Sequence, residues 1–200
     1  MLRVVMSPII HELFMNKVSL RQDLLRRRIA MSSTDWDDRS ALICQKILQN
    51  LPSHCSSILA YFSIRQEPNL AFLWPQFRSL SIPLGVPRCV ENQLVWHRWE
   101  LGDRLVVGAF GILEPEATAP VLQAQDVGLI LVPCVGCDRL GNRIGYGGGF
   151  YDRLLAQTKW RSIPTVGITF EFGVVEPFEA DEWDQSLDYI CTETNWIVCP

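Results

Sequence analysis

The sequence LILVPCVGCDRLGNRIGYGGGFYDRLL, which spans Leu129 to Leu155, gives the strongest indication of the architecture of this chain. It begins with an apolar strand and ends in a helix that opens at Tyr151. Five glycines lie between the two within nine residues: Gly141, Gly145, Gly147, Gly148 and Gly149. Glycines in such a loop let several backbone N–H groups approach one anion and point at it together. The stretch therefore predicts a strand, an anion-binding loop and a helix.

The composition limits the class of protein. With 200 residues, of which 48% are hydrophobic and 20% charged, the chain can bury one substantial core, so we expect a single domain. The net charge of −4 argues against a nucleic-acid partner. No apolar run approaches the ~20 residues that span a bilayer, so we expect no membrane contact.

The chain has a net negative charge, but a cluster of basic residues lies near its N-terminus. It consists of Lys17, Arg21, Arg26, Arg27 and Arg28. Such a run is either a solvated helix face or part of an anion site, and the residues by themselves favour the solvated face.

Seven cysteines are scattered along the chain, at positions 44, 55, 89, 134, 137, 191 and 199. An odd number without regular spacing does not fit the disulfide framework of a small secreted domain, so we expect reduced thiols and a cytoplasmic protein. Cys134 and Cys137 form a C-x-x-C pair, which is compatible with a redox or zinc role. Because no second C-x-x-C or paired histidine motif accompanies it, buried thiols are the preferred interpretation.

Two helices are predicted at the start of the chain. Ser19 and Gln22 have the spacing of a capping box, so the first helix is predicted to begin at Ser19 and to run toward Met31. A second helix is predicted after Ser33 or Thr34, because four residues recur at helical spacing. These inward-facing residues are Trp36, Ser40, Ile43 and Ile47.

Apolar runs further along the chain predict strands. They lie at 58–62, 82–86, 94–99, 129–132, 165–170 and 189–192. Alternation with helical segments favours an α/β fold, a three-layer αβα sandwich with a mostly parallel central sheet. Ligands in such folds bind beyond the carboxyl ends of the strands. Residues 102–126 are predicted to be a long irregular connection, which contains FGILEP at 110–115.

The glycine-rich loop fails to match two common phosphate-binding motifs. A P-loop needs Lys followed by Ser or Thr, and a dinucleotide fingerprint needs a glycine where this chain has Phe150. The loop still combines backbone donors with the Arg143 guanidinium, a tyrosine, and Asp152 as a candidate Mg²⁺ ligand. The alternative is that the glycines only permit a tight turn and that Asp152 caps the helix.

These residues resemble the signature of the 5-formyltetrahydrofolate cyclo-ligases, also called methenyltetrahydrofolate synthetases. That signature is an apolar strand followed by Pro, Asp and the motif G-x-R-[LI]-G-x-G-x-G-[YF]-Y-D. It is matched in register by Pro133, Asp138, Gly141, Arg143, Ile144, Gly145, Gly147, Gly149, Phe150, Tyr151 and Asp152. The signature is long and specific.

The resemblance extends over most of the chain. A K-x-x-L-R element, associated with ATP binding in the family, is present as Lys17, Leu20 and Arg21. Further family positions are matched by Glu67, Pro87, Arg88, the FGILEP segment, Asp184 and Asp188. Cys137 departs from a common aromatic, and Gly148 departs from a residue that is basic in some relatives. Residues 1–16 have no counterpart, and we expect a flexible extension or a product of start-site choice, followed by one cyclo-ligase domain at 17–200.

The resemblance implies an ATP- and Mg²⁺-dependent enzyme that cyclises 5-formyltetrahydrofolate to 5,10-methenyltetrahydrofolate, with release of ADP and phosphate. ATP is expected to phosphorylate the formyl oxygen, after which N10 attacks the activated carbon. Phosphoryl transfer of this kind mostly needs positioning and neutralisation of negative charge. We expect a monomer whose substrates include polyglutamylated folates.

The resemblance also implies roles for individual residues. Catalysis is assigned to Arg143 and Tyr151, and Mg²⁺ binding to Asp152 and Asp184. ATP binding is assigned to Lys17, Arg21, Arg143, Ile144, Gly145, Tyr146, Gly147, Gly148, Gly149, Phe150 and Tyr151. Folate binding is assigned to Phe62, Glu67, Tyr146, Gly147, Gly148, Gly149 and Phe150.

Two other classes of protein stay open. A phosphosugar isomerase or CoA-transferase-like enzyme on a related scaffold would need a catalytic acid and base, and the sequence offers no clear Glu–His or Lys constellation. A folate-binding protein without turnover would use the same pocket with misplaced Mg²⁺ carboxylates. Taken singly, Glu67, Asp184 and Tyr151 also have ordinary explanations as a loop acid, a solvated acid and a buried aromatic.

Overall fold

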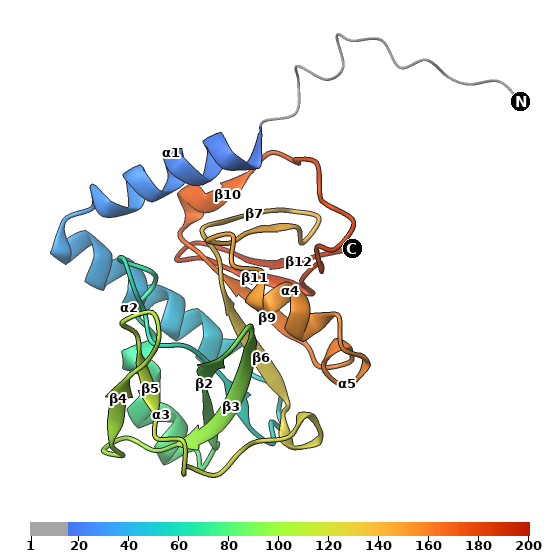
Figure 1. The fold of residues 1–200 in the computed structure, drawn as a ribbon. Coiled ribbons are helices and arrows are strands. Elements are labelled where there is room, and N and C mark those ends of the chain that lie inside the picture. Colours follow the sequence, from blue (N-terminus) through green and yellow to red (C-terminus); the bar gives the residue numbers. More distant parts are fainter. Residues whose placement is uncertain (1–15) are drawn as a thin grey trace, which may run out of the picture.

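The computed structural model describes residues 16–200 (Figure 1). Its α-helices are α1 (Lys17–Ile29), α2 (Ser33–Gln49), α3 (Trp74–Ser79), α4 (Phe150–Leu155) and α5 (Thr158–Arg161). Its strands are β1 (Ile58–Leu59), β2 (Leu84–Val90), β3 (Gln93–Trp99), β4 (Leu105–Val107), β5 (Leu113–Pro115), β6 (Leu129–Pro133), β7 (Gly136–Asp138), β8 (Arg143–Ile144), β9 (Thr165–Ile168), β10 (Val174–Val175), β11 (Tyr189–Cys191) and β12 (Trp196–Val198). Short 3-10 helices lie at η1 (Leu70–Leu73), η2 (Ala124–Asp126) and η3 (Glu171–Gly173).

The central sheet has seven strands in the order β12-β11-β9-β6-β1-β2-β3. The five inner strands pair in parallel, and the edge strands β3 and β12 pair antiparallel to their neighbours. The predicted mostly parallel sheet is therefore confirmed. A smaller sheet, β10-β7-β8, is built from the segments after β6 and β9.

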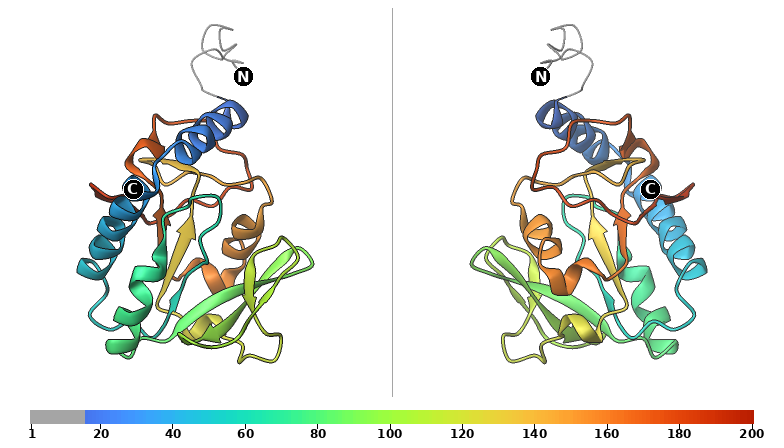
Figure 2. Two further views of the ribbon diagram at one scale, coloured as in Figure 1. Left: turned by 90° about the vertical axis from the view of Figure 1, so that its left-hand side faces the viewer. Right: turned by 90° about the vertical axis from the view of Figure 1, so that its right-hand side faces the viewer.

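Strand β6 shows why this sheet carries helices on both faces. Leu129 and Leu131 belong to a core formed with α2 and α3, whereas Ile130 and Val132 belong to a second core formed with α4 and α5. Side chains alternate between the faces of a strand, so a strand that is apolar at every position needs cover on both sides. Figure 2 shows α2 and α3 on one side of the sheet and α4 and α5 on the other. The predicted three-layer αβα sandwich is confirmed.

The N-terminal helices begin close to their predicted positions, but the capping-box prediction is wrong. The cap of α1 is Asn16, whose side chain accepts a hydrogen bond from the Val18 N–H at 2.8 Å. The Ser19 hydroxyl instead donates to the Asn16 carbonyl at 2.8 Å, inside the first helical turn. Helix α2 begins at Ser33, slightly earlier than the predicted start after Ser33 or Thr34, and is capped by Ser32.

The prediction of an irregular connection at 102–126 is also wrong. The segment contains a β4–β5 hairpin and η2. The hairpin is fixed to β2 by Glu114, which is 2% exposed and accepts a hydrogen bond from the Cys89 N–H at 3.0 Å. Glycine and proline suggested an open loop, but long-range contacts with β2 order the segment.

No described helix, in the range 16–200, is both long and apolar enough to cross a membrane. The predicted N-terminal extension lies outside the described residues except for Asn16, which caps α1.

Two neighbouring residues of α2 test how this helix packs. Ile43 is 0% exposed and Leu42 is 48% exposed. Ile43→Ala should lower the free energy of unfolding by about 2–5 kcal/mol, because it leaves a cavity in the core. Leu42→Ala should change it by about 0.5 kcal/mol or less. Urea denaturation measures both, and equal losses would contradict the packing of this helix face against the sheet.

Candidate active site

The candidate site lies beyond the carboxyl ends of β1 and β6. These strands pair in parallel, with Ile58 opposite Leu129, so the segments that follow them leave the sheet at the same edge. β1 leads to Glu67, and β6 leads through β7 and β8 to residues 145–149, here called the glycine loop. In Figure 1, α1 and β7 lie above this edge of the sheet.

The glycine loop has a backbone conformation that depends on its glycines. Gly147 and Gly149 have φ values of +94° and +65°, which residues with a Cβ rarely adopt. A Cβ at Gly145 or Gly147 would meet no other atom within 4 Å, so one side of the loop is open. The loop therefore has room for a ligand to approach the backbone closely.

Helix α1 brings basic side chains to this loop and to the C-terminal segment. The Arg21 Nε donates a hydrogen bond to the Gly145 carbonyl at 2.6 Å. The Lys17 ammonium forms ion pairs with Asp181, at 2.8 Å, and with Asp184. Burial lowers the pKa of Lys17, but the hydrogen bonds and charges of the two aspartates outweigh it and raise that pKa above 10.5. The sequence-predicted residues Lys17, Arg21 and Asp184 thus gather around one region.

Arg143 of β8 connects two further parts of the site. Its Nη2 donates to the Asp152 carboxylate at the start of α4, and its Nη1 donates to the Gln185 carbonyl at 3.0 Å. The Arg143 side chain is 6% exposed and that of Asp152 is 21% exposed. Because a guanidinium can donate in several fixed directions, this residue links α4 to the segment that carries Asp184.

Glu67 lies in a buried position after two residues in unusual conformations. Arg65 and Gln66 have φ values of +46° and +56°, which are uncommon outside glycine and often mark functional loops. Glu67 is 3% exposed, and its Oε2 accepts a hydrogen bond from the Ile64 N–H at 3.1 Å. Trp36 of α2 donates to the Glu67 carbonyl at 2.8 Å. The acid is therefore held firmly and is not an ordinary exposed loop residue.

The surroundings of the Glu67 carboxyl shift its proton affinity. Burial raises the pKa of Glu67 to about 7, while the Ile64 N–H, the Arg28 charge and the Tyr146 hydroxyl act in the opposite direction. Burial, followed by the nearby Glu67 charge, raises the pKa of three tyrosines. These are Tyr61, Tyr146 and Tyr151, with Tyr146 reaching about 12.

The aromatic residues assigned to the site lie in two groups. The Tyr151 ring packs edge-on against Trp96 at 6.3 Å, and the Phe150 ring packs edge-on against Phe110 of the FGILEP segment at 5.6 Å. Phe62 instead packs edge-on against Trp99, with the ring centroids 5.2 Å apart, on the α2 and α3 side of the sheet. The FGILEP segment thus lies beside the start of α4, whereas the contacts of Phe62 are with core aromatics.

The two predicted Mg²⁺ ligands form a limited donor set. Asp152 is paired with Arg143 and Asp184 with Lys17, and the two side chains are 21% and 13% exposed. Among residues 16–200, no group of three or more His, Cys, Asp or Glu side chains is placed to hold a metal ion. Two carboxylates fit a Mg²⁺ ion whose remaining ligands are phosphate oxygens and water, which is the usual arrangement for this ion.

Sequence reasoning did not assign a role to Arg28, which the structure buries completely. Leu20, Leu24 and Arg28 are spaced four residues apart and form the buried face of α1. This spacing was the available signal, because an arginine on an apolar helix face needs polar partners inside the protein.

Cys134 and Cys137 are free, buried thiols. A hydrogen bond between the Cys137 thiol and Cys134, together with burial, raises the pKa of Cys137 well above its ordinary value. A thiol with a raised pKa is a poor metal ligand and nucleophile, which agrees with the interpretation of these residues as buried core thiols.

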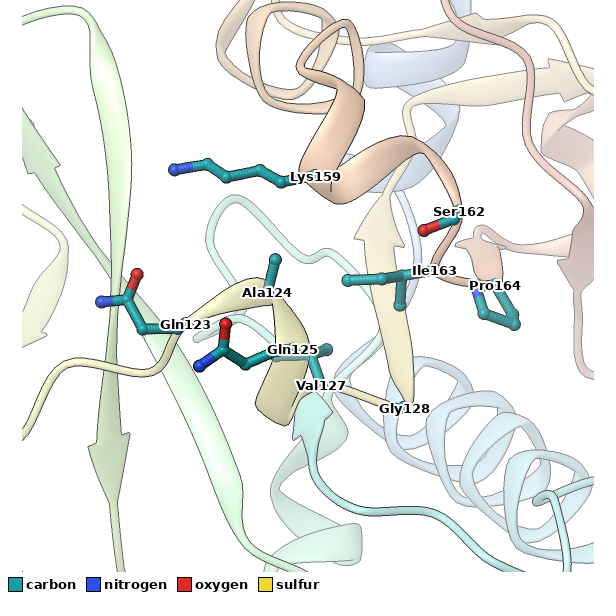
Figure 3. A pocket seen from close by; sticks show the side chains of 9 residues that line it. All are labelled: Gln123, Ala124, Gln125, Val127, Gly128, Lys159, Ser162, Ile163 and Pro164. Carbon is teal, nitrogen blue, oxygen red and sulfur yellow. The ribbon is translucent and has the colours of Figure 1, made fainter.

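A surface hollow of about 490 Å³ lies at the other end of the sheet (Figure 3). It is lined by residues of η2, by the residues just before β6, and by residues of α5 and the segment before β9, among them Lys159 and Pro164. Gly128 and Pro164 immediately precede β6 and β9, so the hollow faces the amino ends of these strands. It is therefore separate from the candidate site.

The buried Glu67 carboxyl predicts a pH-dependent stability. The folded chain keeps the Glu67 proton up to a pH of about 7, whereas the unfolded chain loses it near 4.5. The free energy of unfolding should therefore fall across this range, by up to about 1.4 kcal/mol per pH unit. Glu67→Gln removes the ionisation, so its stability relative to the parent should rise between pH 5 and 7, as chemical denaturation can measure. The exposed Glu182→Gln controls for the lost charge, and a pH-independent difference for Glu67→Gln would contradict the burial.

Comparison with known proteins identifies the family. Residues 14–193 match the model of the 5-formyltetrahydrofolate cyclo-ligase family. The chain is 31% identical to the 5-formyltetrahydrofolate cyclo-ligase of Haemophilus influenzae, over 84% of this chain and 92% of that protein. It is 26% identical to the enzyme of the same name from Mycoplasma pneumoniae, over 90% of this chain and 99% of that protein. The solved structure of Aquifex aeolicus 5,10-methenyltetrahydrofolate synthetase matches with a TM-score of 0.80 and 32% identity, over 92% of this chain and 93% of that one. This chain belongs to the 5-formyltetrahydrofolate cyclo-ligase family.

Proposed function

We propose that the protein catalyses the ATP- and Mg²⁺-dependent conversion of 5-formyltetrahydrofolate to 5,10-methenyltetrahydrofolate, with release of ADP and phosphate. The observation that carries this proposal is the meeting of three features at one sheet edge. They are the open glycine loop, the basic residues of α1 with Arg143, and the buried Glu67. The proposal includes a monomeric cytoplasmic enzyme that also accepts polyglutamylated folates.

ATP is proposed to bind at the glycine loop. Arg21 and Arg143 lie beside this loop, and Lys17 lies one helical turn before Arg21 on α1, so these residues are proposed to supply three positive charges. Backbone N–H groups of residues 145–149 are proposed to donate to the phosphates, which the open side of Gly145 and Gly147 permits. The ATP-binding set is completed by Ile144, Tyr146, Phe150 and Tyr151. Fixed cations and dipoles of this kind favour a transition state in which negative charge is spread over phosphoryl oxygens.

Asp152 and Asp184 are proposed to hold the Mg²⁺ ion. When bound, the ion neutralises phosphate charge and helps to orient the transferred group. The partners of the two aspartates, Arg143 and Lys17, already keep both carboxylates at the site.

The folate is proposed to bind beside Glu67, with Phe62, Tyr146, residues 147–149 and Phe150 lining its pocket. A carboxyl group can accept hydrogen bonds from the N–H groups of a pterin ring. The glycine loop is shared between the two substrates, so the formyl oxygen and the terminal phosphate of ATP are brought together.

The proposed reaction proceeds in two steps. Transfer of the terminal phosphoryl group of ATP to the formyl oxygen converts a poor leaving group into a good one. N10 of the folate then attacks the activated carbon and loses its proton, and the bond from this carbon to the phosphorylated oxygen breaks as phosphate leaves. Arg143 is proposed to stabilise the transferring phosphoryl group, and Tyr151 to fix the reacting groups from the start of α4. Positioning of this kind supplies a large part of the rate in phosphoryl transfer.

A spectrophotometric assay tests this function. The methenyl chromophore should appear only when ATP, Mg²⁺ and 5-formyltetrahydrofolate are all present. Binding of the folate without product would instead support the alternative of a folate-binding protein. If neither ATP nor the folate is consumed in the complete mixture and the protein also binds no folate, both the enzyme and the folate-binding protein are contradicted.

Arg143→Ala should lower kcat by about tenfold or more, because it removes a charge that stabilises the phosphoryl group. Arg139→Ala is the matched control, since Arg139 is an exposed arginine in the turn between β7 and β8. Circular dichroism checks that both variants fold. Turnover of Arg143→Ala close to that of Arg139→Ala would remove Arg143 from the mechanism.

Asp152→Asn and Asp184→Asn should each raise the Mg²⁺ concentration needed for half-maximal activity by about tenfold or more, because each removes a charged ligand. Glu182→Gln is the control, as it removes an exposed acid two residues before Asp184. Activity is titrated against Mg²⁺ at saturating ATP. If the midpoints of both aspartate variants match that of the control, these residues do not bind the ion.

A further inference from the structure

Arg28 is a fully buried arginine in a basic stretch of helix. It is 0% exposed, whereas the side chain of Arg26, two residues earlier, is 78% exposed and pairs with Asp23. Arginine is almost never fully buried unless polar groups compensate for the lost hydration. The burial of Arg28 therefore needs a physical explanation within the protein.

The contacts of Arg28 join two parts of the candidate site. Its Nη1 donates to the Tyr146 hydroxyl at 3.0 Å, and its Nη2 donates to the Cys134 carbonyl at 2.6 Å. Cys134 directly follows β6, and Tyr146 lies in the glycine loop. Both acceptors are neutral, and the buried Nε has no hydrogen-bond partner within residues 16–200. The charge of Arg28 is thus balanced only through space, and Glu67 is the acid whose pKa it lowers.

Tyr146 has few other restraints. It lies between Gly145 and Gly147, where a Cβ would meet nothing within 4 Å, so the loop itself is not packed there. The Arg65 guanidinium lies over the Tyr146 ring, 5.4 Å from its centroid. The position of the Tyr146 ring therefore depends on Arg28 and Glu67 on its hydroxyl side and on Arg65 on its face.

We propose that Arg28 is a positioning residue for the cyclo-ligase reaction: its buried guanidinium ties the glycine loop, through Tyr146, to the end of β6 beside the folate-binding acid Glu67. In this arrangement the nucleotide-binding loop and the folate-binding acid share one anchor on α1. The proposal rests on the proposed function, because that function gives Glu67 and the glycine loop their substrates.

The same guanidinium also influences the charge state of Glu67. A cation close to a carboxyl group favours its ionised form. The groups that face the Glu67 carboxyl are Arg28 from α1, Arg65 and the Ile64 N–H from its own segment, Tyr61 after β1, Tyr146 from the glycine loop and Tyr151 from α4. Only two of these groups are cations, and Arg65 is exposed to solvent, which weakens its effect.

Kinetics of Arg28 variants test the proposal. Arg28→Met should lower kcat/KM for the folate by about tenfold or more, since a buried hydrogen bond from a charged donor is lost. It should also move the pH midpoint of folate binding upward by about one unit. Arg28→Lys keeps the positive charge but cannot reach both acceptors in the same geometry. Its kcat/KM should therefore fall, while its pH midpoint of folate binding should stay close to that of the parent. The exposed Arg26→Met should match the parent in both. Parent-like kcat/KM and midpoint in Arg28→Met would overturn the proposal.

A double-mutant cycle keeps the test decisive if Arg28→Met does not fold. Arg28→Lys removes the planar guanidinium that reaches both acceptors, and Tyr146→Phe removes one of these acceptors, so the two variants disturb the same contact from opposite ends. Their effects on kcat/KM should therefore be smaller together than the sum of the two single effects, and additive effects would overturn the proposal.

A measurement without ligands separates this proposal from the proposed function. If the parent lacks cyclo-ligase activity, the proposed function fails, while the pH dependence of the free energy of unfolding still reports on Arg28 and Glu67. In Arg28→Met the fall in stability should extend about one pH unit higher than in Arg28→Lys. Identical profiles would show that Arg28 does not act on Glu67.

Discussion

Parallel pairing of β1 with β6 is the constraint on which the site depends. The register, Ile58 opposite Leu129, brings the segments after the two strands to one edge of the sheet. One of these segments carries Glu67 and the other leads to the glycine loop, although the two are far apart in the sequence. The pairing is held because both faces of the sheet are buried, with alternate residues of β6 facing the two helical layers. Without it, Glu67 and Tyr146 of the glycine loop would not lie close together.

Helix α1 supplies the second constraint, as a source of positive charge. Three of its basic side chains contact two parts of the site: Lys17 contacts the C-terminal segment, and Arg21 and Arg28 contact Gly145 and Tyr146 of the glycine loop. One rigid helix thus fixes the relative positions of loops that have few contacts of their own. In the proposed reaction, phosphate oxygens and Mg²⁺ meet groups that are already paired, since Asp152 and Asp184 are held by Arg143 and Lys17. Substrate binding would then exchange one set of ion pairs for another, which limits the cost of assembling the charges.

Left-handed backbone conformations occur in both segments that meet at the site. Arg65 and Gln66 precede Glu67 in left-handed conformations, and Gly147 and Gly149 adopt positive φ in the glycine loop. The strain at Arg65 and Gln66 is balanced by firm contacts on both sides of the turn, including the bonds from Ile64 and Trp36 to Glu67. Such a turn presents an acid at a fixed place in the interior, which an extended segment at the end of a short strand would not do.

The sequence by itself determined the two N-terminal helices, the mostly parallel sheet, the three layers and the family, because hydrophobic periodicity and the glycine motif are local patterns. Through the resemblance to the family, the sequence also predicted that one substrate-binding site contains Lys17, Arg21, Arg143 and Glu67. Only the tertiary structure decided that Arg28 turns inward, that residues 102–126 form a hairpin against β2, and that Asn16 rather than Ser19 caps α1. The first two depend on contacts between residues far apart in the chain, which no local pattern records, and the cap depends on which of two nearby polar side chains reaches the free N–H groups.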